Sequence, residues 1–454
     1  MAHPFIAESS VLYRAFDSKR EKVVGSSGIR LFLESGKQII DASAGPSVSV
    51  LGHTRPDVSE ALVRQISECA YIYSGSRFAS PAVEELASFI LQGRPGGLSK
   101  AIFVNSGSEA TDAAMKLATQ YWHEVGQPQR RFVIARKQSY HGNTIGALCV
   151  SGHDSKRALY GDWLSSNVRF VDPCFSYRFK RPDETDEVYV ERLTDQLENL
   201  ILELGPENVS SFIAETVSGS TLGCATAVKG YFKAVREICD KHSILLILDE
   251  VMCGMGKTGT MHAWEQEDIR GPDIQTIGKA LGGGFVPLSG VLLHQKIFDA
   301  LSQGSKSLAH GHTFQAHPAA CAAALAVQKA IHNERLLANV AAMGRVLEGL
   351  LYEQLAPLNI VGDVRGRGLF WAVEFMLDGP ERIPLPAEVN FCARVVDCAL
   401  ELGLNILGNL GRTGTVYVDH VIISPPYIVT EVELRDIVII LRTAIVKLTE
   451  ITFP

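Results

Sequence analysis

Short apolar runs alternate with longer helix-like segments through the middle of the chain, from about residue 100 to residue 295. Each run is continuously apolar, which is typical of strands that are buried on both faces of a mostly parallel sheet. Strands that alternate with helices indicate an α/β fold. The predicted strands are Ala101–Val104, Phe132–Ala135, Phe212–Ala214, Ile244–Leu248, Ile274–Ile277 and Leu288–Leu293.

The pattern changes after Pro318 and predicts an α+β region. Thr430 and Glu433 have the spacing of a capping box, so we expect a helix to begin there. Strands near Ile29–Leu33 and Gln38–Asp41 do not fit the parallel pattern, and we expect the first 60 or so residues to pack against this region. Its predicted elements are helices over Ala319–Ile331, Glu334–Leu355 and Thr430–Glu450, and strands over Arg367–Phe375 and Val416–Ile423.

Composition narrows the class of protein. The 454 residues include 43 Lys and Arg against 50 Asp and Glu, a net charge of −7, which argues against a nucleic-acid partner. The start of the chain lacks the apolar core of a signal peptide, and no run approaches the roughly 20 apolar residues that span a bilayer. The nine cysteines contain no CxxC pair and are interpreted as reduced thiols. We therefore expect a cytoplasmic protein without a membrane partner.

The first candidate site is a turn between the strand that ends near Asn105 and a following helix. Ser106 and Glu109 have capping-box spacing, and Gly107 would let a ligand approach the backbone closely. The unpaired N–H groups and the positive dipole end of such a helix favour an anion. The segment fits either a phosphate site or a helix that is merely capped.

The second candidate is the apolar strand that ends in Asp249 and Glu250. An acid at the carboxyl end of a parallel strand lies where α/β folds place ligands. If Asp249 is ionised and buried, it needs a cationic partner, such as a protonated heterocyclic nitrogen or Mg²⁺. The following Gly254–Thr258 segment is similar to part of a P-loop, but Val251 stands where that motif requires its first glycine.

The third candidate is Lys279, which follows the predicted strand Ile274–Ile277 and precedes three glycines. A lysine in an apolar site has a depressed pKa and can act as a nucleophilic amine. The segment His310–His317 contains three histidines, but no neighbouring residue completes a standard zinc-ligand spacing. We therefore expect no metal site.

Taken in order, these motifs resemble the class III aminotransferases, which are pyridoxal-phosphate (PLP) enzymes of fold type I. The resemblance covers the chain from about Asp41 to the last helix. It implies a large domain with a mostly parallel seven-stranded sheet, over residues 60–310. A small α+β domain would be built from both ends of the chain, residues 1–59 and 311–454. The motifs that carry it are Asn105–Ala110, Tyr140–Gly142, Asp249–Val251, Gly278–Gly284 and Thr313.

The resemblance also implies roles for single residues. Lys279 would form the internal aldimine and shuttle the proton, and Asp249 would keep the pyridine nitrogen protonated so that the ring acts as an electron sink. Gly107 and Ser108 would hold the phosphate. The remaining cofactor contacts would be Tyr140 and Val251 on the two ring faces, Glu215 near the substrate side, and Thr313 on the phosphate of the neighbouring subunit of a homodimer.

The expected reaction moves an amino group from an amine or amino acid donor to a keto acid by a ping-pong route. Met252 stands where many members have Gln, which favours the omega-amine branch. Ser47 and Ser74 stand at positions that are often bulky in omega-amine relatives, so we expect a roomy pocket. Candidate substrate contacts are Ser47, Tyr73 and, for a carboxylate, Arg412. A decarboxylase, racemase or aminomutase of the same fold, and a non-catalytic protein of that fold, remain the alternatives.

Overall fold

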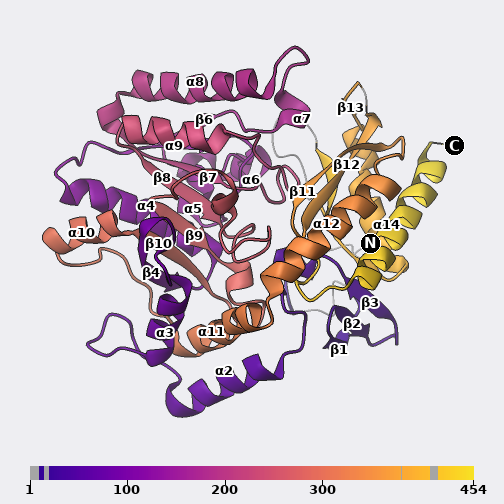
Figure 1. Cartoon of the computed structure of the whole chain (residues 1–454), viewed down its shortest axis with the longest axis horizontal. Coiled ribbons are helices and arrows are strands. Elements are labelled where there is room, and N and C mark those ends of the chain that lie inside the picture. Colours follow the sequence, from indigo (N-terminus) through magenta and orange to yellow (C-terminus); the bar gives the residue numbers. More distant parts are fainter. Residues whose placement is uncertain (1–9, 15–19, 380, 410–417, 454) are drawn as a thin grey trace.

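The computed structural model describes residues 10–14, 20–379, 381–409 and 418–453. A seven-stranded sheet forms the centre of the larger part of the molecule, in the order β4-β10-β9-β8-β7-β5-β6 (Figure 1). Strands β5 to β9 run parallel, and β10 is antiparallel to both of its neighbours. The sheet confirms the predicted fold class. Its strands are β4 (Leu98–Val104), β5 (Phe132–Arg136), β6 (Val168–Val171), β7 (Val209–Glu215), β8 (Leu245–Glu250), β9 (Ile274–Ile277) and β10 (Ser289–His294).

Six of these strands match the predicted apolar runs, whereas the pattern missed β6. This strand lies at the edge of the sheet, has only four residues and includes the polar Arg169. An edge strand pairs on one side only and does not need a continuous apolar run. The edge position therefore accounts for the missing signal.

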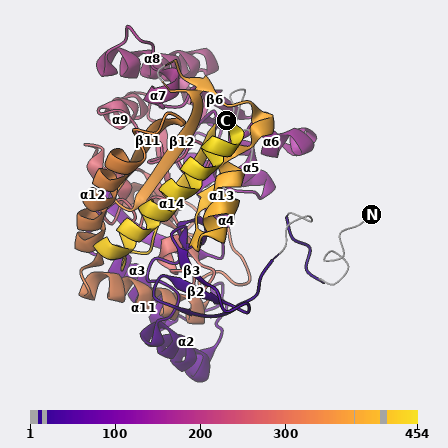
Figure 2. The same ribbon diagram turned by 90° about the vertical axis from the view of Figure 1, so that its right-hand side faces the viewer.

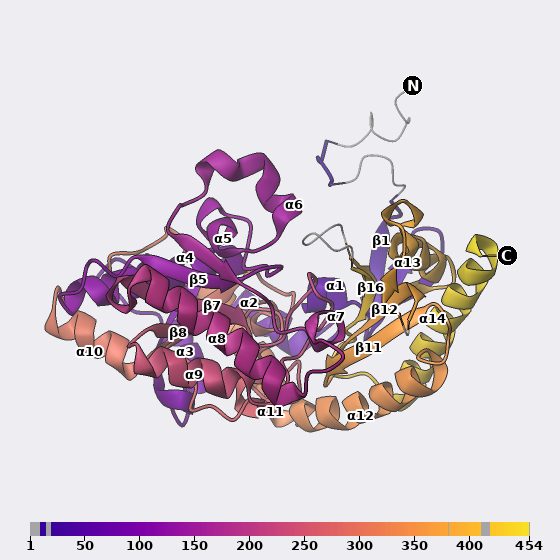
Figure 3. The ribbon, with the colours of Figure 1, turned by 90° about the horizontal axis from the view of Figure 1, so that it is seen from above.

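Helices cover both faces of the sheet, as the unbroken apolar runs predict (Figure 3). Helices α4 (Gly107–Glu124) and α10 (Gln295–Gln303) pack on one face, and α8 (Asp186–Leu204) and α9 (Tyr231–Lys241) lie on the other side. In β8, Leu245 and Ile247 belong to the hydrophobic core on the side of α4 and α10. Leu246 and Leu248 belong to the core on the side of α8 and α9. Successive side chains of a strand alternate between faces, so both sets are buried.

The carboxyl ends of β4, β7, β8 and β9 meet at one edge of the sheet. β10 is antiparallel to β4 and to β9, so these two strands point the same way despite the reversal between them. In open α/β sheets, ligands bind at this edge. Glu215 and Asp249 lie at the ends of β7 and β8, and Lys279 follows the end of β9.

The C-terminal region forms a second sheet in the order β11-β12-β16-β15. Helix α14 lies between α12 and α13 (Figure 2). It begins at the predicted capping box of Thr430 and Glu433. The elements are α11 (Pro318–Asn333), α12 (Leu336–Gln354), β11 (Val361–Arg367), β12 (Phe370–Asp378), β13 (Ile383–Pro384), α13 (Phe391–Glu401), β15 (Leu407–Gly408), β16 (Asp419–Ile423) and α14 (Glu431–Thr452).

The strand predicted over Arg367–Phe375 needs a correction, because a turn divides it. β11 ends at Arg367 and β12 begins at Phe370, and the two pair in antiparallel fashion. Gly368 has a φ of 60°, in the left-handed region that glycine enters without strain. A Cβ at this position would also meet the backbone of Thr258, so the turn packs closely against the larger part of the chain.

The N-terminal segment joins the C-terminal region through a third sheet. Strands β1 (Val23–Ser27), β2 (Arg30–Leu33) and β3 (Gln38–Asp41) form an antiparallel meander, and β3 pairs in parallel with β14 (Leu404–Asn405). Among the described residues, no helix is both long enough and apolar enough to cross a membrane. The other helices include α1 (Ala44–Ser47), α2 (Pro56–Cys69), α3 (Pro81–Ile90), α5 (Ile145–Val150), α6 (Asp154–Arg157) and α7 (Ser176–Phe179).

Lys257, from the segment that is similar to part of a P-loop, is completely buried where distant parts of the chain meet. The carbonyl of Lys257 accepts from the N–H of Leu369 at 3.1 Å. Nearby, the N–H of Tyr427 donates to the carbonyl of Val50 at 2.7 Å. The ammonium lies 4.9 Å from the centre of the Tyr427 ring and has no hydrogen-bond partner among the described residues. Burial lowers the pKa of Lys257 to about 7. This lysine therefore cannot serve as a phosphate ligand at the surface.

We predict that Lys257→Met stabilises the protein most at low pH. The unfolded chain binds a proton near pH 10.5 and the folded chain only near pH 7, so the cost of burying the lysine is complete at or below pH 7. It declines as the pH rises from 7 to 10.5. Urea unfolding should show a gain of about 1–4 kcal/mol at pH 6 and a smaller gain at pH 9.5.

The control for that measurement is Lys233→Met, which removes the same charge from a side chain that is 56% exposed. Its effect should be small and equal at the two pH values. A gain for Lys257→Met that is identical at pH 6 and pH 9.5 would contradict the prediction.

Candidate active site

A cavity of about 440 Å³ opens at the edge where the carboxyl ends of the strands meet. Its walls come from the ends of β7 and β8, the turn after β9 and the start of α4. The cavity brings together seven residues that the sequence singled out from five separate stretches. They are Gly107, Ser108, Tyr140, Glu215, Asp249, Val251 and Lys279.

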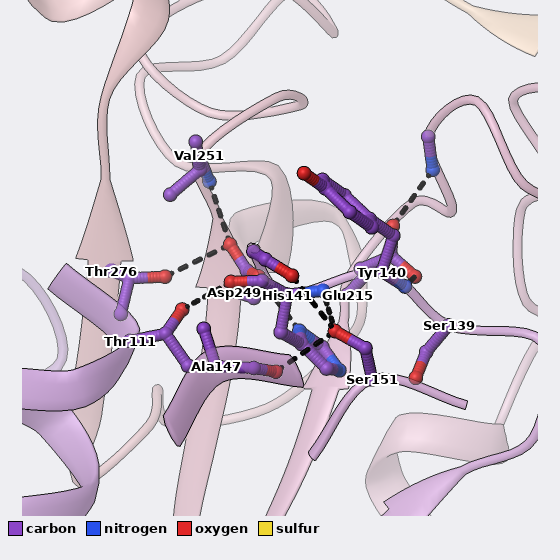
Figure 4. A network of polar contacts seen from close by, with 12 residues as sticks. Thr111, Ser139, Tyr140, His141, Ala147, Ser151, Glu215, Asp249, Val251 and Thr276 are labelled. Atoms are coloured by element: carbon purple, nitrogen blue, oxygen red, sulfur yellow. Dashed lines mark hydrogen bonds and ion pairs between the residues drawn. The ribbon is translucent and has the colours of Figure 1, made fainter. Parts of the chain in front are cut away.

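Asp249 is a buried carboxylate with three hydrogen-bond donors (Figure 4). Its Oδ2 lies 2.7 Å from Nδ1 of His141, and its Oδ1 accepts from the N–H of Val251 at 3.0 Å and from the hydroxyl of Thr276 at 2.9 Å. Burial alone raises the pKa of Asp249, but the hydrogen bond and charge of His141, with the other two donors, bring it below its ordinary value. Asp249 is therefore ionised, and Nδ1 of His141 donates to it.

His141 is itself held from two sides. Its N–H donates to the hydroxyl of Ser151 at 2.8 Å, and its carbonyl accepts from the hydroxyl of Thr111 at 2.7 Å (Figure 4). Nε2 is buried and has no hydrogen-bond partner among the described residues. These bonds fix the ring that supports Asp249, so His141 positions the carboxylate.

The pKa of the adjacent acid, Glu250, is shifted in the opposite direction from that of Asp249. Glu250 points to the other side of β8, because successive side chains alternate along a strand. Burial raises the pKa of Glu250 to about 7, although neutral donors lower it in part. Asp249 differs because its partner, His141, can carry a positive charge. The donors to Glu250 are Thr216, Ala263, Trp264 and Gln275, at 2.8–3.0 Å.

Lys279 begins the turn after β9 and points into the same cavity as Asp249. Its φ of 43° is in the left-handed region, which residues other than glycine enter at a cost and which is common at functional sites. Burial lowers the pKa of Lys279, and the negative charges of Asp249 and Glu215 oppose that shift in part. The site thus favours the free amine that nucleophilic chemistry requires.

Glu215 ends β7 and lies beside the strand that carries Asp249. Its Oε1 accepts from the N–H of Gly219 at 3.0 Å and its Oε2 from the N–H of Tyr140 at 3.4 Å (Figure 4). Burial raises the pKa of Glu215. Glu215 therefore ties the backbone at Tyr140 to the cavity wall at Gly219.

The turn from β4 into α4 forms the remaining wall. The hydroxyl of Ser106 accepts from the N–H of Glu109 at 3.2 Å, as the capping box predicts. The Glu109 carboxylate instead accepts from the N–H of Asn105 at 2.7 Å, one residue earlier than in the standard box. A Cβ on Gly107 would lie 2.7 Å from Cγ1 of Val251, so only glycine leaves this surface open.

Three other predicted residues, Thr313, Ser47 and Tyr73, do not line the cavity of this chain. Thr313 is exposed, and its carbonyl accepts from the hydroxyl of Tyr71 at 2.7 Å. Ser47 is buried beside Pro46, a cavity residue, and its hydroxyl has no partner among the described residues. Tyr73 is 52% exposed. Arg412 lies outside the described residues.

The sequence did not assign roles to His141 and Thr276. His141 stands inside the Tyr140–Gly142 motif, and that position is the one signal that could have pointed to it. Thr276 reaches Asp249 because the two lie opposite each other in the register of β9 and β8, which no local pattern reveals. Within the described residues, no three His, Cys, Asp or Glu side chains gather as a metal site would require.

Comparison with known proteins identifies the family. The family model for class III aminotransferases matches residues 17–445. The chain belongs to the class III aminotransferases. It is therefore a transaminase with PLP as its cofactor, and it is similar in sequence to named aminotransferases. An uncharacterized aminotransferase of Schizosaccharomyces pombe is 43% identical over 94% of this chain and 93% of that protein.

More distant relatives and solved structures agree with this assignment. The chloroplastic gamma aminobutyrate transaminase 3 of Solanum lycopersicum is 32% identical over 96% of this chain and 82% of that protein. The crystal structure of an omega transaminase from Pseudomonas jessenii in complex with pyridoxamine phosphate (PMP) is 30% identical, with a TM-score of 0.89. The matched region covers 95% of this chain and 93% of the Pseudomonas jessenii chain.

The cavity fits PLP on three independent counts. Asp249 is an ionised carboxylate that can accept from a protonated ring nitrogen, and Lys279 offers a desolvated amine. The first turn of α4 presents backbone N–H groups to a phosphate where Gly107 leaves room. When bound, PLP supplies an electron sink for bonds broken at the substrate carbon.

We predict that Gly107→Ala weakens PLP binding about tenfold or more. The added Cβ would meet Val251 at 2.7 Å and push the start of α4 away from the cofactor. The measurement is the cofactor that remains after dialysis, followed by its absorbance. Gly349→Ala is the matched control, since a Cβ there has no neighbour within 4 Å, and it should retain PLP like the unmodified chain. Equal retention by both variants would contradict the prediction.

Proposed function

We propose that this transaminase moves an amino group from an amine or omega-amino acid donor to a keto acid by a ping-pong route. The observation that carries the proposal is the meeting of Lys279 and Asp249, from adjacent strands, in a cavity that also contains the Gly107 turn. An amine, a buried carboxylate and an anion-binding helix start are the three groups that PLP chemistry needs from a protein.

Each residue has a defined task in this proposal. Nζ of Lys279 would hold the cofactor through its aldehyde and, once released, would carry the proton that the substrate carbon gives up. Oδ2 or Oδ1 of Asp249, supported by His141, keeps the ring nitrogen protonated. Tyr140 and Val251 enclose the two ring faces and exclude water.

The omega-amine preference rests on the cavity and on the relatives. Met252 lines the cavity and provides an apolar wall rather than an amide donor. Relatives include gamma aminobutyrate transaminases, and the structures similar to this chain include an omega transaminase. We propose a pocket that accepts long donors, with Ser47 near its entrance. The names of these relatives support transamination over the alternatives of decarboxylation, racemisation or amino-group migration.

We further propose a homodimer with shared active sites. Thr313 is exposed and does not line the cavity of its own chain, which is consistent with a contact to the phosphate in a second copy. Large apolar side chains are also exposed, as expected of a surface that a partner covers. Examples are Leu159 at 86%, Phe78 at 76% and Trp163 at 72%.

Two further expectations remain proposals. The division of the chain into residues 1–59, 60–310 and 311–454 is supported by the pairing of β3 with β14, which joins the two ends. A cytoplasmic location is supported by the nine cysteines, all of which are free thiols.

We predict that Lys279→Ala abolishes turnover and the absorbance of the lysine-bound cofactor, because the variant lacks the amine that would bind the cofactor aldehyde. Asp249→Asn should still bind cofactor but lower kcat by roughly a hundredfold or more, since a neutral amide no longer stabilises the protonated ring. Single-turnover kinetics with an amine donor provides the measurement. Lys233→Met, on the surface of α9, is the control. Turnover by Lys279→Ala would refute the proposed role.

The shared site predicts complementation between two inactive variants. Thr313→Glu places a negative charge where the proposal puts the partner's phosphate, so this variant and Lys279→Ala should each be inactive alone. Random mixing of dissociated subunits makes half of the dimers mixed, each with one intact site, and should restore about a quarter of full activity. If the mixture remains inactive while sedimentation shows mixed dimers, the sites are not shared.

A further inference from the structure

Two cationic side chains line the active-site cavity without a task in the proposed chemistry. Lys156, which belongs to α6, and Arg14, from the N-terminal segment, share the cavity with Lys279 and Asp249. The ammonium of Lys156 lies 5.4 Å from the centre of the Tyr140 ring. The positive charge of Lys156 therefore lies close to the ring of Tyr140, which would cover the cofactor.

Neither cation is neutralised by the described residues. Both lack an ion pair with any described Asp or Glu. Burial lowers the pKa of Lys156, and the like charge of Arg14 adds to that shift. Lys156 is half-buried, whereas Arg14 is exposed. An anion beside them would relieve their mutual repulsion and compensate Lys156 for its lost hydration.

The anions already in the cavity do not meet this need. Asp249 is bound by His141 and two further donors, and Glu215 accepts from two backbone N–H groups. His153 also lines the cavity, and burial lowers its pKa to about 4, so its imidazole is neutral at physiological pH and adds a polar contact without charge. The two described acids of the cavity are therefore already hydrogen-bonded by groups other than Lys156 and Arg14.

We propose that Lys156, with Arg14 beside it, receives a carboxylate at the end of the substrate remote from the reacting amino or carbonyl group. The proposal rests on the proposed transaminase function and names its substrate class as omega-amino acids and the keto acids that carry a second carboxylate. It assigns the carboxylate contact to α6 and the N-terminal segment, whereas the sequence pointed to Arg412. The three donors of an ammonium suit carboxylates presented at various angles.

The decisive experiment compares two donors that differ only in charge, 4-aminobutanoate and 4-aminobutanamide. Lys156→Met should raise KM for the acid about tenfold or more, with little change in kcat and less than about twofold change for the amide. Lys156→Arg should restore much of the preference, because it keeps the charge. Arg14→Met should shift KM in the same direction by a smaller factor. Lys233→Met removes a surface charge and should leave both donors unaffected.

A binding measurement separates this proposal from the proposed function. Calorimetry with the unreactive analogues pentanoate and pentanamide should show that the loaded protein prefers the acid and that Lys156→Met loses this preference. If the unmodified protein turns over neither donor, the proposed donor class fails, while calorimetry still decides the role of Lys156. Equal effects of Lys156→Met on acid and amide would overturn the carboxylate site. A loss of acid preference in Arg412→Met alone would overturn it as well.

Discussion

A charged carboxylate at the buried end of β8 is the constraint on which the rest of the active site depends. An ionised Asp249 in the protein interior would cost several kcal/mol if it were unpaired. Three neighbours remove that cost: the imidazole of His141, the hydroxyl of Thr276 and the backbone N–H of Val251. Each comes from a different element, so the network also holds those elements in register. A carboxylate that is already desolvated and oriented can stabilise a cationic ring without further rearrangement.

Val251 shows how closely the surrounding elements must approach for this arrangement to form. Its Cγ1 lies 2.7 Å from where a Cβ of Gly107 would stand and 3.2 Å from where one of Gly278 would stand. Two glycines, one at the start of α4 and one directly after β9, therefore make room for one valine between the start of α4 and the turn that carries Lys279. Packing therefore couples three segments: the start of α4, the turn after β9 that carries Lys279, and strand β8. These segments also meet at the same edge of the sheet.

Local signals in the sequence predicted most of the sheet and the main chemical groups, whereas the cofactor followed from the resemblance to the family. Continuous apolar runs marked six strands, and Asp249 and Lys279 follow such runs directly. Contacts that depend on how strands pair had no such signal: Thr276 supports Asp249 only through the register of β8 and β9. The turn at Gly368 was missed for a similar reason. The close approach of Gly368 to the backbone of Thr258 is a tertiary contact that the local sequence does not reveal. Local patterns thus specify elements, while tertiary packing specifies their partners.

The parts of the site that carry chemistry and the parts that would select the substrate come from different layers of the structure. Asp249 and Lys279 lie on or next to rigid central strands, where a small displacement would separate proton donor from acceptor. Lys156 and Arg14 come from a short helix and the N-terminal segment, outside the sheet. Substitutions there can change the charge of the cavity without disturbing the network around Asp249. Because the two layers are separate, the substrate can change while the reaction stays the same. We therefore expect differences in substrate between this transaminase and its relatives to arise at Lys156 and Arg14 rather than in the sheet.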